Sequence, residues 1–194
     1  MIFASRRGQS IIEALVALTI LTVGLMGVLA LLSRSLFLQR QTADAAKASY
    51  LASEGIEVAK SLIDNGVYQG VANGNETGGW AGTATNCFEL SGPYYYYLDF
   101  ESYSCQQVSQ SPETSQFQWD PLYLGAGPDG TPRYYDESDP NRPANAVLTP
   151  FSRSVEIVRP DTNTIDVIST VKWSSGSIAG QSVTVEDVFY NWHP

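Results

Sequence analysis

The chain has few of the residues on which common enzyme sites are built. Its 194 residues include two cysteines and one histidine, and no GxGxxG or GxxxxGK[ST] stretch occurs. Structural zinc takes four ligands, so the Cys and His residues are too few for a zinc site within one chain. His193 stands at the very end of the sequence, which is a poor place to hold a catalytic base rigidly. We therefore expect neither enzymatic activity nor a cofactor.

Positive charge is also scarce. The chain has 11 Lys and Arg residues against 20 Asp and Glu, a formal net charge of −9. Residues 1–65 are nearly balanced, with six basic and five acidic residues, whereas residues 66–194 hold five basic and fifteen acidic residues. Phosphate contacts need clustered cations, so we expect no nucleic-acid partner. With 43% hydrophobic and only 16% charged residues, a disordered acidic tail is not expected either.

A long uncharged run lies near the N-terminus. Residues 14–32 carry no charge and, as a helix, would span about 28 Å, the thickness of one bilayer core. A secretory signal peptide has an apolar core of only ~7–15 residues and a small-residue cleavage site, and residues 32–35 lack that site. The run therefore predicts a transmembrane helix, with Arg6 and Arg7 holding the N-terminus in the cytoplasm.

Glu13 stands at the start of this apolar run. A carboxylate inside a membrane is costly, on the order of 2.5–3.5 kcal/mol at a helix centre. One interpretation is an interfacial side chain that reaches the headgroups or favours the helix N-terminus. The other is a partner for a cation. Cleavage between Gly8 and Gln9 would create an α-amine four residues before Glu13, which a neighbouring subunit could offer to this carboxylate.

The block from Arg6 to Leu18, RRGQSIIEALVAL, resembles the N-terminal signature of type IV prepilins and type II secretion pseudopilins, and most closely that of minor pilins and pseudopilins. The resemblance implies a leader peptide over residues 1–8, cut by a prepilin peptidase after Gly8. It implies that Gln9 becomes a methylated N-terminus, although the family usually has Phe at this position. It also implies that Glu13 is the assembly residue.

The same resemblance implies a location and partners. The chain would be a single-pass protein of the cytoplasmic membrane and then part of an extracellular filament. Its partners would be other pilin subunits, the peptidase and an inner-membrane assembly platform. Residues 9–34 would form the transmembrane and filament-core helix, residues 35–65 its amphipathic continuation, and residues 66–194 an extracytoplasmic, loop-rich β domain.

Apolar residues at helical spacing predict that the helix continues beyond the membrane. They form one face that should pack on the C-terminal domain: Ala48, Leu51, Ala52, Gly55, Ile56, Ala59, Leu62 and Ile63. Asn65-Gly66 is typical of a helix end. Gly24 and Gly27 in the apolar half favour either close helix packing or a point at which the helix can unwind.

The C-terminal third reads as β-strands. Runs of β-branched and aromatic residues cover 151–158, 164–173 and 182–192, with a loop expected over 174–181. An antiparallel sheet packed on the helix, with apolar residues buried on both faces, gives an α+β, pilin-like fold. Tyr94–Tyr97 favours a further strand, with an adhesive aromatic surface as the alternative.

Two smaller features leave alternatives open. Cys87 and Cys105 could form a disulfide that closes about 18 residues outside the cytoplasm, or remain buried thiols. The carboxylates between residues 127 and 141 could bind calcium, but their spacing is not that of an EF-hand loop and turn chemistry explains most of them: Asp129, Asp136, Glu137 and Asp139.

The sequence therefore favours a structural, minor subunit of a type IV pilus or related pseudopilus filament. Pilus, secretion pseudopilus and DNA-uptake filament all remain open at this point. The alternative is a single-pass, membrane-anchored extracytoplasmic binding or adhesion protein that never polymerises.

Overall fold

The computed structural model describes residues 9–72, 80, 94–99, 104–109, 119–137, 139–175 and 178–191. The fold is α+β, with one long helix, α1, and seven antiparallel strands. The chain divides after Ala43 into two units. The described part of the first is the N-terminal portion of α1, and the second, from Asp44 onward, holds the rest of α1 and the whole sheet.

Helix α1 spans Gln9–Ala72. The predicted end at Asn65-Gly66 is wrong, because the helix continues through this pair to Ala72. A glycine in a helix interior costs about 1 kcal/mol relative to alanine. The extra turns offset that cost, since Gly66 is buried and Val67 packs against the hydrophobic core.

Strand β5 is the centre of the sheet. Strand β6 pairs along one edge of β5, while β3 and β1 share the other edge. Strand β4 pairs with β3, β2 with β1, and β7 with β6. The strands are β1 (Tyr94–Asp99), β2 (Ser104–Ser109), β3 (Asp120–Ala126), β4 (Pro132–Tyr135), β5 (Val147–Val158), β6 (Thr164–Ser175) and β7 (Ile178–Tyr190).

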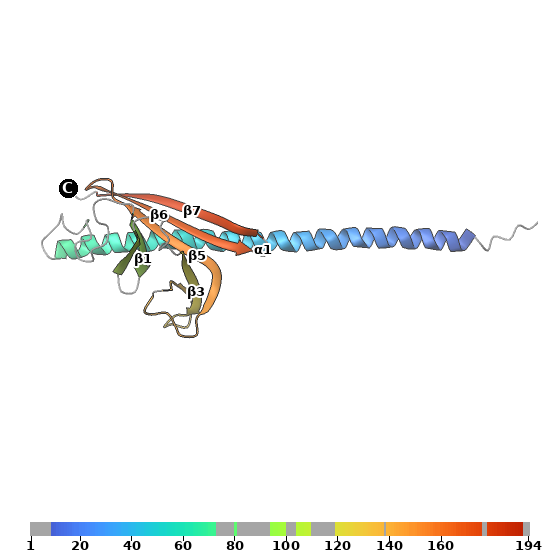
Figure 1. Ribbon diagram of the computed structural model, residues 1–194, viewed down its shortest axis with the longest axis horizontal. Coiled ribbons are helices and arrows are strands. Elements are labelled where there is room, and N and C mark those ends of the chain that lie inside the picture. The colour runs from blue at the N-terminus through green and yellow to red at the C-terminus, as the bar shows by residue number, and fades with distance from the viewer. Residues whose placement is uncertain are drawn as a thin grey trace, which may run out of the picture. The chain divides into compact units, whose positions relative to one another are not determined.

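The core lies between the second part of α1 and one face of the sheet (Figure 1). All eight residues of the predicted helix face are buried. They meet the alternating inward residues of β5 and β6, which are Phe151, Val155, Ile157, Ile165, Val167, Val171 and Trp173. The α+β arrangement predicted from the sequence is therefore confirmed.

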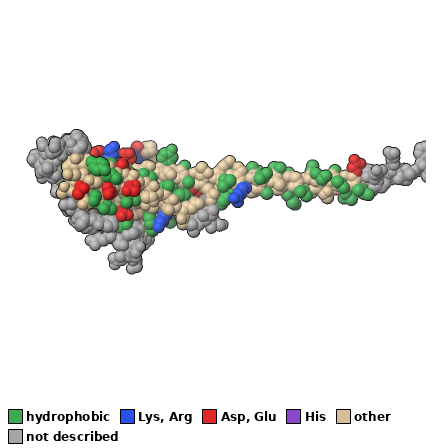
Figure 2. All heavy atoms as spheres, turned by 90° about the horizontal axis from the view of Figure 1, so that it is seen from above, with side chains coloured by type: hydrophobic (Ala, Val, Ile, Leu, Met, Phe, Trp, Pro, Cys, Tyr) green, Lys and Arg blue, Asp and Glu red, His purple; other side chains and the backbone are tan. Residues whose placement is uncertain are grey.

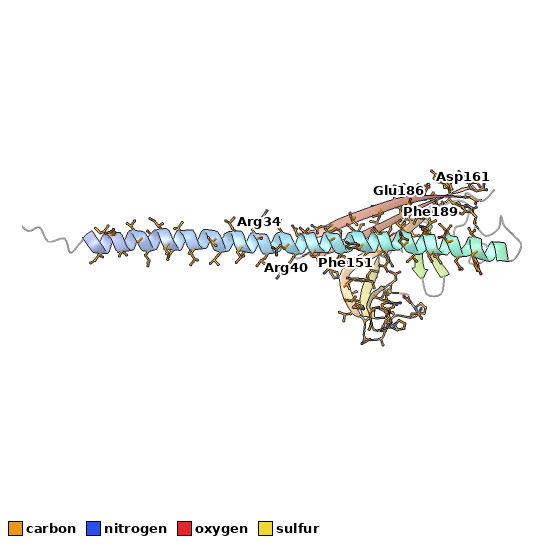
Figure 3. All side chains as sticks on the ribbon, turned by 180° about the vertical axis from the view of Figure 1, so that it is seen from behind. Arg34, Arg40, Phe151, Asp161, Glu186 and Phe189 are labelled. Carbon is orange, nitrogen blue, oxygen red and sulfur yellow. The ribbon has the colours of Figure 1, made fainter. Side chains whose placement is uncertain are left out.

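The prediction that apolar residues are buried on both sheet faces is wrong. Val188 and Tyr190 lie on the outer face of β7 and are 36% and 65% exposed. A helix packs on only one face of the sheet, so in the described part of the chain these side chains have no second layer to cover them. Figure 3 shows Phe189 on the side of β7 that faces α1 and Glu186 on the opposite side.

The loop predicted over 174–181 is shorter in the structure. Strand β6 extends to Ser175 and β7 begins at Ile178, with a register shift between Trp173 and Ser175. Gly180 adopts φ 78°, a conformation that costs glycine little. Because Gly180 can adopt this conformation, β7 continues through the register shift, although the Gly- and Ser-rich sequence predicts a loop there.

Gly55 is where α1 and the sheet come closest. A Cβ atom at this position would stand 2.5 Å from the Ser169 hydroxyl, 3.2 Å from its Cβ and 3.3 Å from a Val155 methyl. A glycine is therefore required for this packing distance. The buried Ser169 hydroxyl has no hydrogen-bond partner in the described part of the chain.

Candidate functional site

The first unit presents a helix whose apolar side chains are uncovered. From Ile11 to Phe37 and Leu38, the large hydrophobic residues are 37–73% exposed. This is the one segment of the described chain that is long and apolar enough to cross a membrane. So much apolar surface is unfavourable in water, so lipid or other protein chains must cover it.

The hydroxyl groups of this helix suit an apolar medium. Thr19 donates to the Val16 carbonyl at 2.7 Å, and Thr22 to the Thr19 carbonyl at 2.9 Å. Ser33 donates to the Leu29 carbonyl at 2.9 Å. These three hydroxyl groups are thereby satisfied within the helix, as a low-dielectric environment demands.

The predicted processing and assembly residues lie at the N-terminal end of α1. Gly8 lies outside the described residues. Gln9 is the first residue of the helix, and Glu13 lies one turn further along with an exposed side chain. Four helical residues rise about 6 Å, so the two positions are one turn apart. No ion pair forms at Glu13 within the described part of the chain, so its carboxylate is available to another molecule.

Packing against the described residues does not require a glycine at Gly24 or Gly27. A Cβ atom added at either position would meet nothing within 4 Å. If close packing explains these glycines, the neighbour must belong to another molecule. This contrasts with Gly55, whose space is filled by the chain's own sheet.

The second unit contains a buried charge cluster that the sequence did not reveal. Arg153 of β5 is only 7% exposed, and one guanidinium nitrogen donates to both carboxylate oxygens of Asp136 at 3.1 Å. Its other terminal nitrogen lies 3.5 Å from the Leu51 carbonyl and 3.6 Å from a Glu54 oxygen. The cluster ties the segment after β4 to both the central strand and α1.

Burial raises the pKa of Glu54, while the nearby Arg153 opposes this and Asp136 adds to it. Glu54 is therefore the weaker partner of Arg153, and its carboxylate is half exposed. Asp136, which is almost fully buried, holds the guanidinium through two hydrogen bonds. The Arg153–Asp136 pair is therefore the main stabilising interaction of the cluster.

Three of the four carboxylates considered for calcium, Asp129, Asp136 and Asp139, interact with donor groups of the protein. Hydrogen bonds from the Thr131 hydroxyl (2.6 Å) and amide (3.1 Å) lower the pKa of Asp129 to about 2, and Arg133 adds an ion pair at 3.1 Å. Asp136 is paired with Arg153, and Asp139 accepts from the Asn141 amide at 2.8 Å. Within the described residues, no group of three potential ligands could hold a metal ion.

The remaining predicted features fall partly outside what the structure describes. Cys87 lies outside the described residues. Cys105 lies on β2 opposite Leu98, and its side chain is also outside the described set. The strand predicted for the tyrosine run is confirmed as β1. Tyr95 is 6% exposed and donates to a Glu156 oxygen at 3.0 Å; burial, followed by this contact, raises its pKa to about 12.

Comparison with known proteins adds no relative. No family model, no curated protein and no solved structure matches this chain. The architecture itself is pilin-like: a long N-terminal helix, apolar and able to span a membrane in its first part, packs its second part on an antiparallel sheet. The functional argument therefore rests on the residues and contacts described above.

Proposed function

We propose that this chain is a minor structural subunit of a type IV pilus or related pseudopilus filament. The observation that carries the proposal is the exposed apolar segment of α1 on a pilin-like fold. Between Gln9 and Arg34, the only charged residue of this helix is Glu13. Before assembly, lipid would cover the uncharged part of this segment, up to Ser33, with the sheet unit outside the cytoplasm. In the filament, the same segments of neighbouring copies would cover one another.

The proposed role of Glu13 is to set the register of assembly. Cleavage after Gly8 would give Gln9 a free α-amine, a cation that would then be methylated. In an apolar bundle, the carboxylate of one subunit would pair with the amine of its neighbour. A buried pair adds little stability over apolar packing, but a mispaired register leaves a charge uncompensated and is strongly disfavoured.

The partners in this proposal are other pilin subunits, a prepilin peptidase and an inner-membrane assembly platform. The subunit itself performs no catalysis and contacts no nucleic acid. The acidic composition of residues 66–194 supports the second point, because a surface with this charge repels phosphates.

N-terminal sequencing and filament shearing test the proposal together. In the cells that make the protein, the mature chain should begin at Gln9 and be found in sheared filaments. Gly8→Val should leave an uncut precursor outside the filaments. Glu13→Val should be cut normally yet enter filaments poorly, whereas the control Glu57→Val, which removes an exposed carboxylate from the same helix, should enter normally.

A mature chain that still begins at Met1, and that stays in the membrane without partners, would overturn the proposal. That result would support a membrane-anchored protein that never polymerises. Normal incorporation of both the Gly8 and the Glu13 variants would also overturn it.

A further inference from the structure

The end of the apolar helix segment carries a short basic and aromatic row. Arg34, Phe37 and Arg40 are spaced three residues apart on α1, and all three are exposed. At 100° per residue, the two arginines lie 60° on either side of Phe37 around the helix axis, and about 9 Å apart along it. We call these three residues the helix row. Figure 3 shows both arginines projecting away from the helix.

A membrane does not explain the exposed apolar side chains of this region. The uncharged run ends at Ser33, and its twenty residues from Ala14 already span about 30 Å, the thickness of the hydrocarbon core. Leu36, Phe37 and Leu38 follow it and are 50%, 37% and 48% exposed. These residues lie beyond the length of helix that matches the hydrocarbon core, so we look for a protein surface that can cover them.

The outer face of the sheet carries a row of complementary character. Glu156 on β5, Ile168 on β6 and Glu186 on β7 are direct neighbours across the three strands. Adjacent strands lie about 4.8 Å apart, so the backbones at the two glutamates are separated by roughly 9.6 Å, with an apolar residue between them. We call these three residues the sheet row. Its spacing matches that of the helix row, and its charges are opposite.

Among the described residues, no cation pairs with the sheet row. Glu186 forms no ion pair within the described residues, and Glu156 accepts a hydrogen bond from the neutral Tyr95 hydroxyl. Lys172, which lies on the same face, is placed over the Trp119 ring at 3.7 Å. Figure 2 shows acidic and hydrophobic side chains side by side on the sheet unit. The two carboxylates therefore present negative charge that a cationic partner can neutralise.

A cluster of exposed apolar residues elsewhere on this unit is a poorer match. Leu124, Val147 and Leu148 are exposed where β3 meets β5. Arg142 lies beside them, 4.1 Å above the ring of Tyr123, which pairs with Leu148. A basic residue at this end would repel the arginines of the helix row.

We propose that the helix row of one copy docks on the sheet row of a second copy of this chain. Phe37 packs on Ile168, and the two arginines pair with Glu156 and Glu186. This inference rests on the proposed filament role, because it takes the partner to be another subunit. It assigns a lateral contact outside the apolar bundle, and therefore one that salt weakens.

Photocrosslinking from Phe37 in the full chain tests the contact. Two versions of the chain with different tags, one with a benzoylphenylalanine at position 37, are co-expressed, and crosslinked peptides are identified from sheared filaments. The crosslink should join different copies and map to β6 or β7. Glu186→Lys should lower its yield about fivefold, as expected when one exposed pair turns from attraction to repulsion, and Arg40→Glu should restore it in the double variant.

The matched control is Glu57→Lys, which makes the same charge change at an exposed site on α1 and should leave the yield unchanged. Filaments that form with a normal Gln9 terminus, but crosslink from Phe37 elsewhere or only within one copy, overturn the contact and leave the filament role intact. A chain that is neither cut nor assembled overturns the filament role instead.

Discussion

The packing of Gly55 on Ser169 gives the sharpest test of the fold. Gly55→Ala places a Cβ 2.5 Å from a buried hydroxyl, which must move against strand β6. Overpacking of this kind costs about 1–3 kcal/mol, while alanine gains about 1 kcal/mol of helix propensity. We expect the variant to be about 1 kcal/mol less stable than the wild type. An exposed control on the same helix, Ser53→Ala, should be unchanged or slightly more stable.

The second half of the test removes the hydroxyl. Ser169→Ala deletes a buried group with no partner, so it should raise the free energy of unfolding by about 1 kcal/mol. In the Gly55→Ala/Ser169→Ala double variant, the nearest remaining contacts are 3.2 and 3.3 Å. The two changes should therefore couple by about 1–2 kcal/mol. Denaturant titration of the full chain in detergent, followed by near-UV circular dichroism, measures the free energy of unfolding of the wild type, the two single variants and the double variant.

Additive effects, or a Gly55→Ala variant as stable as the Ser53→Ala control, would refute the close approach of helix and sheet. In that case α1 would sit farther from β6, and the glycine would have no packing role.

The buried charges give two further predictions. Asp136→Asn should destabilise the chain by about 3 kcal/mol because it leaves Arg153 buried beside a neutral amide, whereas Glu54→Gln should be neutral or stabilising at pH 7; denaturant titration compares them. Tyr95 should resist ionisation: its folded pKa exceeds the unfolded value, so its contribution to stability is complete below about pH 10 and lost as the pH rises toward 12. Absorbance of wild type minus Tyr95→Phe should show ionisation at pH 12 but little at pH 10.5, and equal titration with exposed tyrosines would contradict this.

Periodicity alone located the core of the second unit. The sequence predicts every residue of the buried helix face from Ala48 to Ile63, because eight apolar or small residues follow the 3.6-residue repeat. The buried residues of β6, which are Ile165, Val167, Val171 and Trp173, occupy alternate positions of the sequence, as a strand with one buried face requires. These patterns are local, so they can be recognised without knowing which surface the residues pack against.

Contacts between distant segments could not be predicted in this way. Arg153 and Asp136 meet because β3 pairs with β5 and β4 pairs with β3, which brings the residue after β4 close to β5. No local repeat in the sequence encodes these pairings. The prediction that the helix ends at Asn65-Gly66 is wrong for a related reason. The local preference of this pair for a helix end was overridden by the tertiary packing of Val67.

The position of Glu13 links processing to assembly in the proposed mechanism. A plain membrane anchor gains only the interaction of this carboxylate with the helix N-terminus, and it bears a cost of up to about 3 kcal/mol if the carboxylate is drawn into the hydrocarbon. The precursor cannot relieve that cost in a bundle, because its Gln9 nitrogen is still in a peptide bond and carries no charge, and the nearest cations, Arg6 and Arg7, lie six or more residues before Glu13. After the cut, the amine lies one helical turn from this position. The uncut chain would thus bring the wrong charges to the wrong depth, and only the trimmed chain could satisfy the carboxylate of its neighbour.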